Sequence, residues 1–188
     1  MMKFQNIILI VSGYLIFGCA TPKSKASPEQ MRQLKEVINE RHFEIESDWA
    51  LPLTTNALVS LQNAGLFPPG SNANQINLIG NPNYFKVKND SVFAYLPYYG
   101  EVQMSAGHYG NDDGSIVIKN TIDDLEIERK KNGYQLKFRT IAKNEGYRIF
   151  LNLFTNGRTS LRLNGNNRFP IEYTGRFSAL ELKEKSSL

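Results

Sequence analysis

Few residues in this chain have the types and spacing that chemistry requires. Its two histidines are His42 and His108, and neither lies at zinc-ligand spacing from another histidine, a cysteine or a carboxylate. We therefore interpret both as surface or capping histidines and predict no metal site. The segment Asn111-Asp112-Asp113-Gly114 lacks the alternating carboxylates and distal glutamate of a calcium-binding EF-hand loop, so we interpret it as a polar turn.

The sequence contains no motif for nucleophilic or phosphate chemistry. There is no Gly-x-Ser-x-Gly elbow and no glycine loop of the kind that cradles phosphate. The carboxylate pairs Asp112-Asp113 and Asp123-Asp124 are adjacent in the sequence, and adjacent residues of a strand point to opposite faces. We therefore predict no catalytic residues and no cofactor. A hydrolase site assembled only by the fold stays open as an alternative.

Three tyrosines form the most distinctive group of side chains. Tyr95, Tyr98 and Tyr99 lie within seven residues of sequence, Ala94-Tyr95-Leu96-Pro97-Tyr98-Tyr99-Gly100. They are the candidate ligand-binding residues, because tyrosine rings stack on sugars and other flat ligands. The alternative, which we favour, is structural: the three rings seal one end of a hydrophobic core.

Cys19, the only cysteine in the chain, predicts attachment to a membrane. Residues 1–18 combine Lys3 with an apolar run that is shorter than the ~20 residues of a membrane span, which is typical of a secretory signal. The run ends in Ile16-Phe17-Gly18-Cys19, which resembles the lipobox of bacterial lipoproteins. We predict a signal peptide over 1–18 and a lipid anchor on Cys19; an ordinary signal with a chance cysteine is the alternative.

The residues after Cys19 indicate where the protein is held. Residues 19–26 are small and polar and are interpreted as a lipidated tether, whose extended reach is about 25 Å. Ala20 is not the aspartate that retains lipoproteins in the inner membrane. By that analogy we expect a lipid-anchored protein of the cell envelope, in the outer membrane.

Charge and length limit the classes of function. The chain has 22 basic and 18 acidic residues and a formal net charge of +4, with no long run of like charge, so we predict no nucleic-acid partner. Residues 27–188 have the size of one domain. A lone cysteine also forms no disulfide within the chain, so this domain must be stabilised by its hydrophobic core.

One helix is predicted at the start of the domain. Ser27 is a suitable N-cap, Pro28 suits the first helical position, and Gln30 completes a capping box. Apolar residues then recur at helical spacing, and the helix is expected to end near Arg41. We expect this helix to pack against a sheet.

Three hairpins can be assigned with their registers. An Asn132-Gly133 turn would pair Glu128 with Lys137 and Glu126 with Arg139, which matches both charges and apolar faces. A three-residue loop ending at Gly157, in the left-handed conformation, pairs Leu151 with Leu161. An Asn89-Asp90 turn pairs Val87 with Val92 and Phe85 with Ala94.

Consecutive hairpins of this kind favour an antiparallel sheet. We expect a mainly β (α+β) fold, with the N-terminal helix packed on a curled antiparallel sheet of roughly eight strands. Shorter strands are expected near residues 43–45, 75–79, 115–119 and 171–176. An open barrel and a sandwich both fit this pattern.

Four features in order resemble a known family. They are Arg41-His42-Phe43 at the helix end, Leu96-Pro97-Tyr98-Tyr99-Gly100, the Asn156-Gly157 hairpin and Tyr173-Thr174-Gly175. Over roughly residues 30–180 the chain resembles the Bacteroidetes-type lipoproteins that carry the domain of unknown function numbered 4251. The resemblance implies a shared fold and supplies no catalytic residues.

These observations favour a non-enzymatic envelope lipoprotein. Its β-domain is expected to bind an unknown small ligand or an envelope protein, and its lipid to bind the membrane. One alternative is a structural subunit of an outer-membrane assembly, which predicts a large exposed apolar patch. A second alternative is a hydrolase acting on envelope glycan or lipid, which predicts a cleft that gathers two carboxylates or a histidine and a hydroxyl.

Overall fold

The computed structural model describes residues 26–103, 114–143 and 145–180. Two helices, α2 (Pro28–Glu40) and α3 (Asn56–Asn63), accompany ten strands in this part of the chain. The strands are β1 (His42–Pro52), β2 (Ile76–Asn77), β3 (Tyr84–Lys88), β4 (Ser91–Leu96), β5 (Ile116–Thr121), β6 (Asp123–Lys130), β7 (Gly133–Ala142), β8 (Glu145–Phe154), β9 (Arg158–Gly165) and β10 (Ile171–Ala179). The fold is therefore mainly β, as the alternating pattern predicts.

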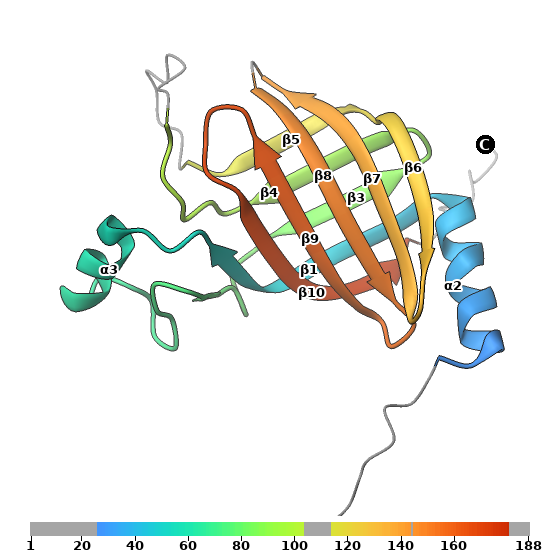
Figure 1. Ribbon diagram of the computed structural model, residues 1–188, viewed down its shortest axis with the longest axis horizontal. Helices are drawn as coiled ribbons and strands as arrows, with labels where there is room; N and C mark the ends of the chain where they lie inside the picture. Colours follow the sequence, from blue (N-terminus) through green and yellow to red (C-terminus); the bar gives the residue numbers. More distant parts are fainter. Residues whose placement is uncertain (1–25, 104–113, 144, 181–188) are drawn as a thin grey trace, which may run out of the picture.

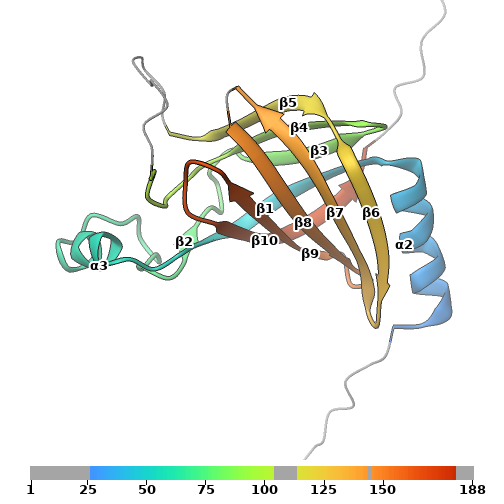
Figure 2. The same cartoon turned by 45° about the horizontal axis from the view of Figure 1, so that its top comes forward.

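All ten strands belong to one antiparallel sheet. Nine of them follow the order β5-β4-β3-β1-β10-β9-β8-β7-β6, and β2 pairs with β1. The sheet curls until its two ends meet (Figure 1, Figure 2). At that seam Thr140 Oγ1 donates to Thr121 O (2.8 Å) and Asn120 Nδ2 donates to Ile141 O (2.9 Å). The result is a nearly closed barrel, which decides between the two architectures that the sequence allows.

The interior of the barrel is one continuous hydrophobic core. On β8 the alternate residues Tyr147, Ile149, Leu151 and Leu153 are buried, because successive side chains of a strand point to opposite faces. Phe43, Phe85, Phe138 and Tyr173 are the largest fully buried side chains. The described helices, strands and core residues all lie between Pro28 and Ala179. Residues 26–188 therefore contain what the domain needs to fold.

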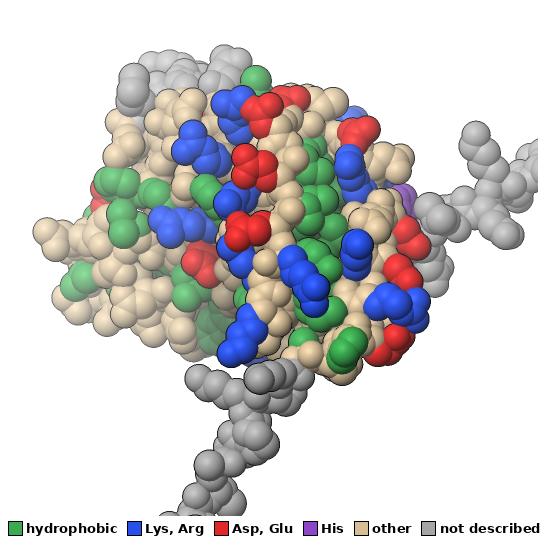
Figure 3. Space-filling view, turned by 45° about the vertical axis from the view of Figure 1, so that its right-hand side comes forward, with side chains coloured by type: hydrophobic (Ala, Val, Ile, Leu, Met, Phe, Trp, Pro, Cys, Tyr) green, Lys and Arg blue, Asp and Glu red, His purple; other side chains and the backbone are tan. Residues whose placement is uncertain are grey.

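Helix α2 lies across one end of the barrel (Figure 1). Ser27 and Gln30 form the expected capping box, and the helix ends at Arg41, whose φ of 47° is left-handed. Met31, Leu34 and Ile38 are buried toward the barrel, so the predicted packing of the helix on the sheet is confirmed. On this side a stripe of hydrophobic side chains runs between two groups of charged ones (Figure 3).

Two of the three predicted registers are confirmed. Val87 pairs with Val92 across the Asn89-Asp90 turn, and Leu151 pairs with Leu161 across the loop that ends at Gly157. Gly157 has a φ of 78°, which is the left-handed conformation that the three-residue loop requires.

The register predicted for the β6–β7 hairpin is wrong by two residues. Lys137 lies opposite Glu126, and Gln135 lies opposite Glu128. The turn is made by residues 131–132, because Gly133 belongs to the strand. A Cβ atom on Gly133 would lie 2.0 Å from Leu153 O, so this glycine is needed for the close approach of β7 to β8. The shift by two leaves each side chain on its expected face.

A second helix, α3, is present where only irregular chain and short strands were expected. Thr55 caps it by accepting a hydrogen bond from Leu58 N. The helix belongs to residues 53–83, which connect β1 to β3 and which we call the arm. The arm extends beyond the end of the barrel opposite to α2 (Figure 1, Figure 2).

Several predictions concern residues outside the described part of the chain. They are the signal peptide over 1–18, Cys19 with most of the 19–26 tether, His108 and Asn111-Asp112-Asp113. His42, at the start of β1, is half-buried. Neither described helix is long and apolar enough to cross a membrane.

Candidate functional site

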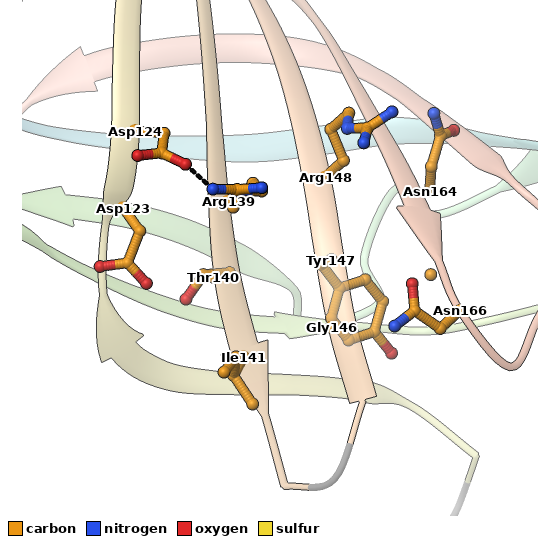
Figure 4. A pocket seen from close by; sticks show the side chains of 11 residues that line it. Asp123, Asp124, Arg139, Thr140, Ile141, Gly146, Tyr147, Arg148, Asn164 and Asn166 are labelled. Atoms are coloured by element: carbon orange, nitrogen blue, oxygen red, sulfur yellow. Dashed lines mark ion pairs between the residues drawn. The ribbon is translucent and has the colours of Figure 1, made fainter.

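A hollow of about 730 Å³ lies on the outside of the barrel near one rim. This volume is within the range of small-molecule sites. Its lining comes from the start of β6, from β7, β8 and β9, and from the residue that follows β9 (Figure 4). The lining residues are Asp123, Asp124, Arg139, Thr140, Ile141, Gly146, Tyr147, Arg148, Asn164, Gly165 and Asn166. We call this feature the rim hollow.

A row of polar side chains crosses the rim hollow from strand to strand. Arg139 on β7 lies opposite Arg148 on β8, and Arg148 lies opposite Asn164 on β9. These outward positions are set by the same alternation that sends Thr140 and Tyr147 into the barrel. The sheet register therefore gathers two guanidinium groups and an amide side by side (Figure 4).

The two arginines of the row differ in their partners. Arg139 forms an ion pair with Asp124, and both side chains are 62% exposed. Arg148 forms no ion pair and no hydrogen bond with any described residue. Like charges directly opposite each other destabilise a sheet, and the Asp124 carboxylate offsets only one of the two. Arg148 is thus the cation of the hollow that is available to an anion.

The end of the row at the barrel rim is uncharged. Asn166 N donates to Gly146 O (3.2 Å), which holds the segment after β9 against β8. Gly146 contributes no side chain between Ile141 and Asn166, so this part of the hollow stays open. The amides of Asn164 and Asn166 each offer both donors and an acceptor, which suits hydroxyl groups of a ligand. The Asn164 oxygen already accepts from Arg162 Nε (3.3 Å).

A buried ion pair lies directly behind the rim hollow, inside the barrel. Glu145 and Arg168 have side chains that are each 10% exposed, and Arg168 Nε lies 2.9 Å from Glu145 Oε2. The carboxylate also accepts from the Tyr147 hydroxyl (2.6 Å) and from Asn167 N (3.2 Å). A buried carboxylate is tolerated when it is paired and hydrogen-bonded in this way.

The residues around this ion pair are fitted closely to it. A Cβ atom on Gly165 would lie 2.2 Å from Glu145 Oε1, so a side chain at that position of β9 would have to displace the Glu145 carboxylate. On the other side the Arg168 guanidinium lies over the Tyr98 ring, 4.7 Å from its centroid. The Tyr98 hydroxyl lies within hydrogen-bond distance of Glu101 O (2.9 Å) and Phe169 O (3.0 Å). These contacts hold together the start of β8, the loop after β9 and the segment after β4, which form this rim of the barrel.

The tyrosines of the rim remain protonated at neutral pH. Burial raises the pKa of Tyr98 to about 12. Burial, followed by the hydrogen bond to Glu145, raises the pKa of Tyr147. Burial likewise raises the pKa of Tyr173 well above its ordinary value and raises that of Tyr99. Each hydroxyl is therefore a hydrogen-bond donor rather than a general base.

The three candidate tyrosines do not form one platform. Tyr98 and Tyr99 pack against the end of the core, and the Tyr173 hydroxyl donates to Pro97 O, just before them in the chain (2.9 Å). Tyr95 lies on the outside of β4, where its ring is 6.4 Å from that of Tyr84. The arrangement of Tyr98 and Tyr99 is the one that the structural interpretation expects.

The sequence offered only a partial signal for the residues of the rim. By alternation along β8, Glu145 and Tyr147 lie on the same face as the buried Ile149 and Leu151. The sequence therefore indicates that the Glu145 carboxylate points into the barrel. Arg168 lies in a loop after β9, and nothing in the sequence places it against Glu145. Arg148 and Asn164 are paired by the β8–β9 register that the sequence predicts, whereas Arg139 joins them only through the β7–β8 pairing.

Within the described residues, no group of three or more histidine, cysteine or carboxylate side chains gathers at metal-binding distance. Two described carboxylates line the rim hollow, Asp123 and Asp124. They are consecutive in sequence, and Asp124 forms an ion pair with Arg139.

Comparison with known proteins identifies a family without an assigned activity. A family model described as a domain of unknown function, DUF4251, matches residues 25–177. No curated protein matches the chain.

Proposed function

Because the chain belongs to the DUF4251 family of unknown function, we propose its function from the geometry of the barrel: it is a non-enzymatic binding protein whose rim hollow holds a small, hydroxylated organic anion. The observation that carries this proposal is Arg148, an exposed guanidinium that faces the hollow and has no ion-pair or hydrogen-bond partner among the described residues. An acidic sugar is the chemical class that fits best.

The lining supports an anion that also carries hydroxyl groups. Guanidinium groups bind carboxylate and phosphate through two parallel hydrogen bonds. Arg148 can form such a bidentate contact. The side-chain amides of Asn164 and Asn166 and the Asp123 carboxylate provide donors and acceptors for hydroxyls. At about 730 Å³, the hollow has room for a sugar ring rather than for an inorganic ion alone.

We further propose that the protein is a Bacteroidetes-type lipoprotein of the cell envelope, held on the outer membrane through Cys19. The support is the signal over 1–18 and the lipobox-like Ile16-Phe17-Gly18-Cys19. A barrel held outside the inner membrane would meet soluble glycan fragments, for which the rim hollow is suited. Envelope proteins are the other class of partner.

Isothermal titration calorimetry of residues 26–188 tests the binding site. The probes are glucuronate and the matched neutral sugar glucose. We expect glucuronate to bind and glucose to bind at least about tenfold more weakly, since a charge-assisted contact contributes ~1.5–3 kcal/mol. The Arg148→Gln variant should lose a similar factor toward glucuronate.

The matched control is Arg176→Gln. Arg176 is an exposed arginine of β10 outside the hollow, and its loss should leave glucuronate affinity within about twofold. Equal affinity for glucuronate and glucose would show that the rim hollow is not an anion site. So would an equal loss of glucuronate affinity in Arg148→Gln and Arg176→Gln.

A further inference from the structure

The arm, residues 53–83, has an unusual surface for a chain in which 21% of residues are charged. There is no charged side chain between Asp48 and Lys86, so the whole arm is neutral. The described residues include ten exposed large hydrophobic side chains, and half of them lie on the arm. They are Leu53, Val59, Leu61, Leu66 and Ile79, with exposed fractions from 40% to 69%.

The helix of the arm is only lightly packed. Leu58 is the one residue of α3 that is buried, and Val59 and Leu61 remain 40% and 41% exposed. Leu66 and Ile79, at 68% and 69%, are the most exposed large hydrophobic side chains among the described residues. Single exposed apolar residues are ordinary, but a group of them on a neutral projection indicates a contact surface.

Several backbone amides of the arm donate to the arm's own polar side chains. Gln62 Oε1 accepts from Ala73 N (2.7 Å), and Asn77 Oδ1 accepts from Ile79 N (2.9 Å). Ser71 Oγ accepts from Asn77 N (3.0 Å). A protein partner could supply such hydrogen bonds across an interface, whereas the apolar part of a bilayer cannot. Because these backbone amides already have hydrogen-bond partners within the arm, we favour lipid over protein as the molecule that covers the arm.

We propose that the arm rests on a lipid bilayer and places Leu66 and Ile79 at the boundary between headgroups and acyl chains. Shallow insertion of aliphatic side chains is favourable because it removes apolar surface from water. The arm carries no charge that would have to be desolvated and none that would seek anionic lipid. Its binding is therefore independent of lipid charge and of salt.

The position of the arm gives the bound protein an orientation. The arm and α2 lie at opposite ends of the longest axis of the molecule (Figure 1). A tether ahead of α2 and the arm, both on one bilayer, would lay the barrel along the membrane. The arm is a surface separate from the rim hollow, so lipid binding by the arm does not depend on ligand binding in the hollow.

The first test places a polarity-sensitive fluorophore on the arm. Cys19 is the only cysteine in the chain, so residues 26–188 can be labelled at one introduced position, Leu66→Cys. An N-terminal hexahistidine segment then tethers the domain to phosphatidylcholine vesicles that contain a nickel-chelating lipid. We expect a blue shift on tethering, unchanged by added phosphatidylglycerol or salt. The matched control is Val117→Cys, an exposed apolar site on β5, where no shift is expected.

The second test measures the untethered domain by sedimentation with phosphatidylcholine vesicles. Leu66→Asn combined with Ile79→Asn should weaken partitioning by about tenfold, since each change removes much of one aliphatic side chain from the bound surface. Val117→Asn should leave partitioning unchanged. Both arm positions are exposed, so the variants keep their fold.

Two results would overturn the proposal. The first is a fluorophore at residue 66 that stays in a water-like environment on tethered vesicles. The second is a blue shift that appears without vesicles as the protein concentration rises, which would make the arm an interface between proteins.

Discussion

Replacing Arg168 by methionine should destabilise the domain by about 3 kcal/mol. The substitution removes the cation but keeps an apolar side chain of similar length over Tyr98. It leaves the buried Glu145 carboxylate without its 2.9 Å partner. Breaking a buried ion pair by removing one member costs about 3–5 kcal/mol. Because the carboxylate keeps the Tyr147 hydroxyl and Asn167 N as donors, the lower end of that range applies.

Urea unfolding of residues 26–188, followed by far-ultraviolet circular dichroism, measures this loss. A drop of about 3 kcal/mol corresponds to a fall in Tm of about 6–12 °C for a domain of this size. Combining Arg168→Met with Glu145→Gln should recover at least about 1 kcal/mol relative to the sum of the single changes, since no uncompensated charge remains.

The exposed Arg176 provides the control for this measurement, because Arg176→Met should change the unfolding free energy by less than about 0.5 kcal/mol. A loss below about 1 kcal/mol for Arg168→Met would contradict the reasoning. It would mean that water screens the Glu145–Arg168 pair as it screens a surface pair.

Gly133→Ala should cost about 2–3 kcal/mol in urea unfolding, because its Cβ would lie 2.0 Å from Leu153 O; a cost below about 0.5 kcal/mol would contradict that packing. The raised pKa of Tyr98, about 12, favours its protonated form in the folded state. Stability should therefore be fully present below pH ~10 and fall as pH rises toward about 12, and a flat urea midpoint over that interval would refute this. In cells fed labelled palmitate, the full chain should take up lipid and Cys19→Ala should not; an unlabelled wild-type chain would rule out the anchor.

The sequence predicts the local parts of this fold well. The capping box at Ser27, the end of α2 near Arg41 and the loop at Gly157 depend on residues within a few positions of each other. The alternation of β8 likewise gives the buried face directly. These features are set by local geometry, which a sequence records.

The errors arise where a distant strand decides the local structure. Asn132-Gly133 is the strongest two-residue turn signal in the chain, yet Gly133 belongs to β7 because β8 passes too close for a side chain. α3 was missed because its helical segment is short and buries only Leu58. The rim depends on Arg168 reaching Glu145 from another loop, and no local pattern encodes that contact.

The tyrosine segment shows the same limit for the candidate site. Its composition allowed a ligand platform or, as we favoured, a seal on the core, and strand alternation sends Tyr95 to the outside of β4. Tyr98 instead lies under Arg168 at the end of the core. The polar row of the rim hollow is composed of ordinary surface residues, and only the register across β7, β8 and β9 brings them together.

Nuclear magnetic resonance shows residue by residue whether the rim hollow binds a hydroxylated anion. Glucuronate should be titrated into isotopically labelled residues 26–188 while the backbone amide signals are followed. Shifts concentrated on Gly146, Arg148, Asn164 and Asn166, and absent from the arm, are the expected result. Unchanged signals for these residues, or shifts concentrated elsewhere on the barrel, would contradict the proposed site.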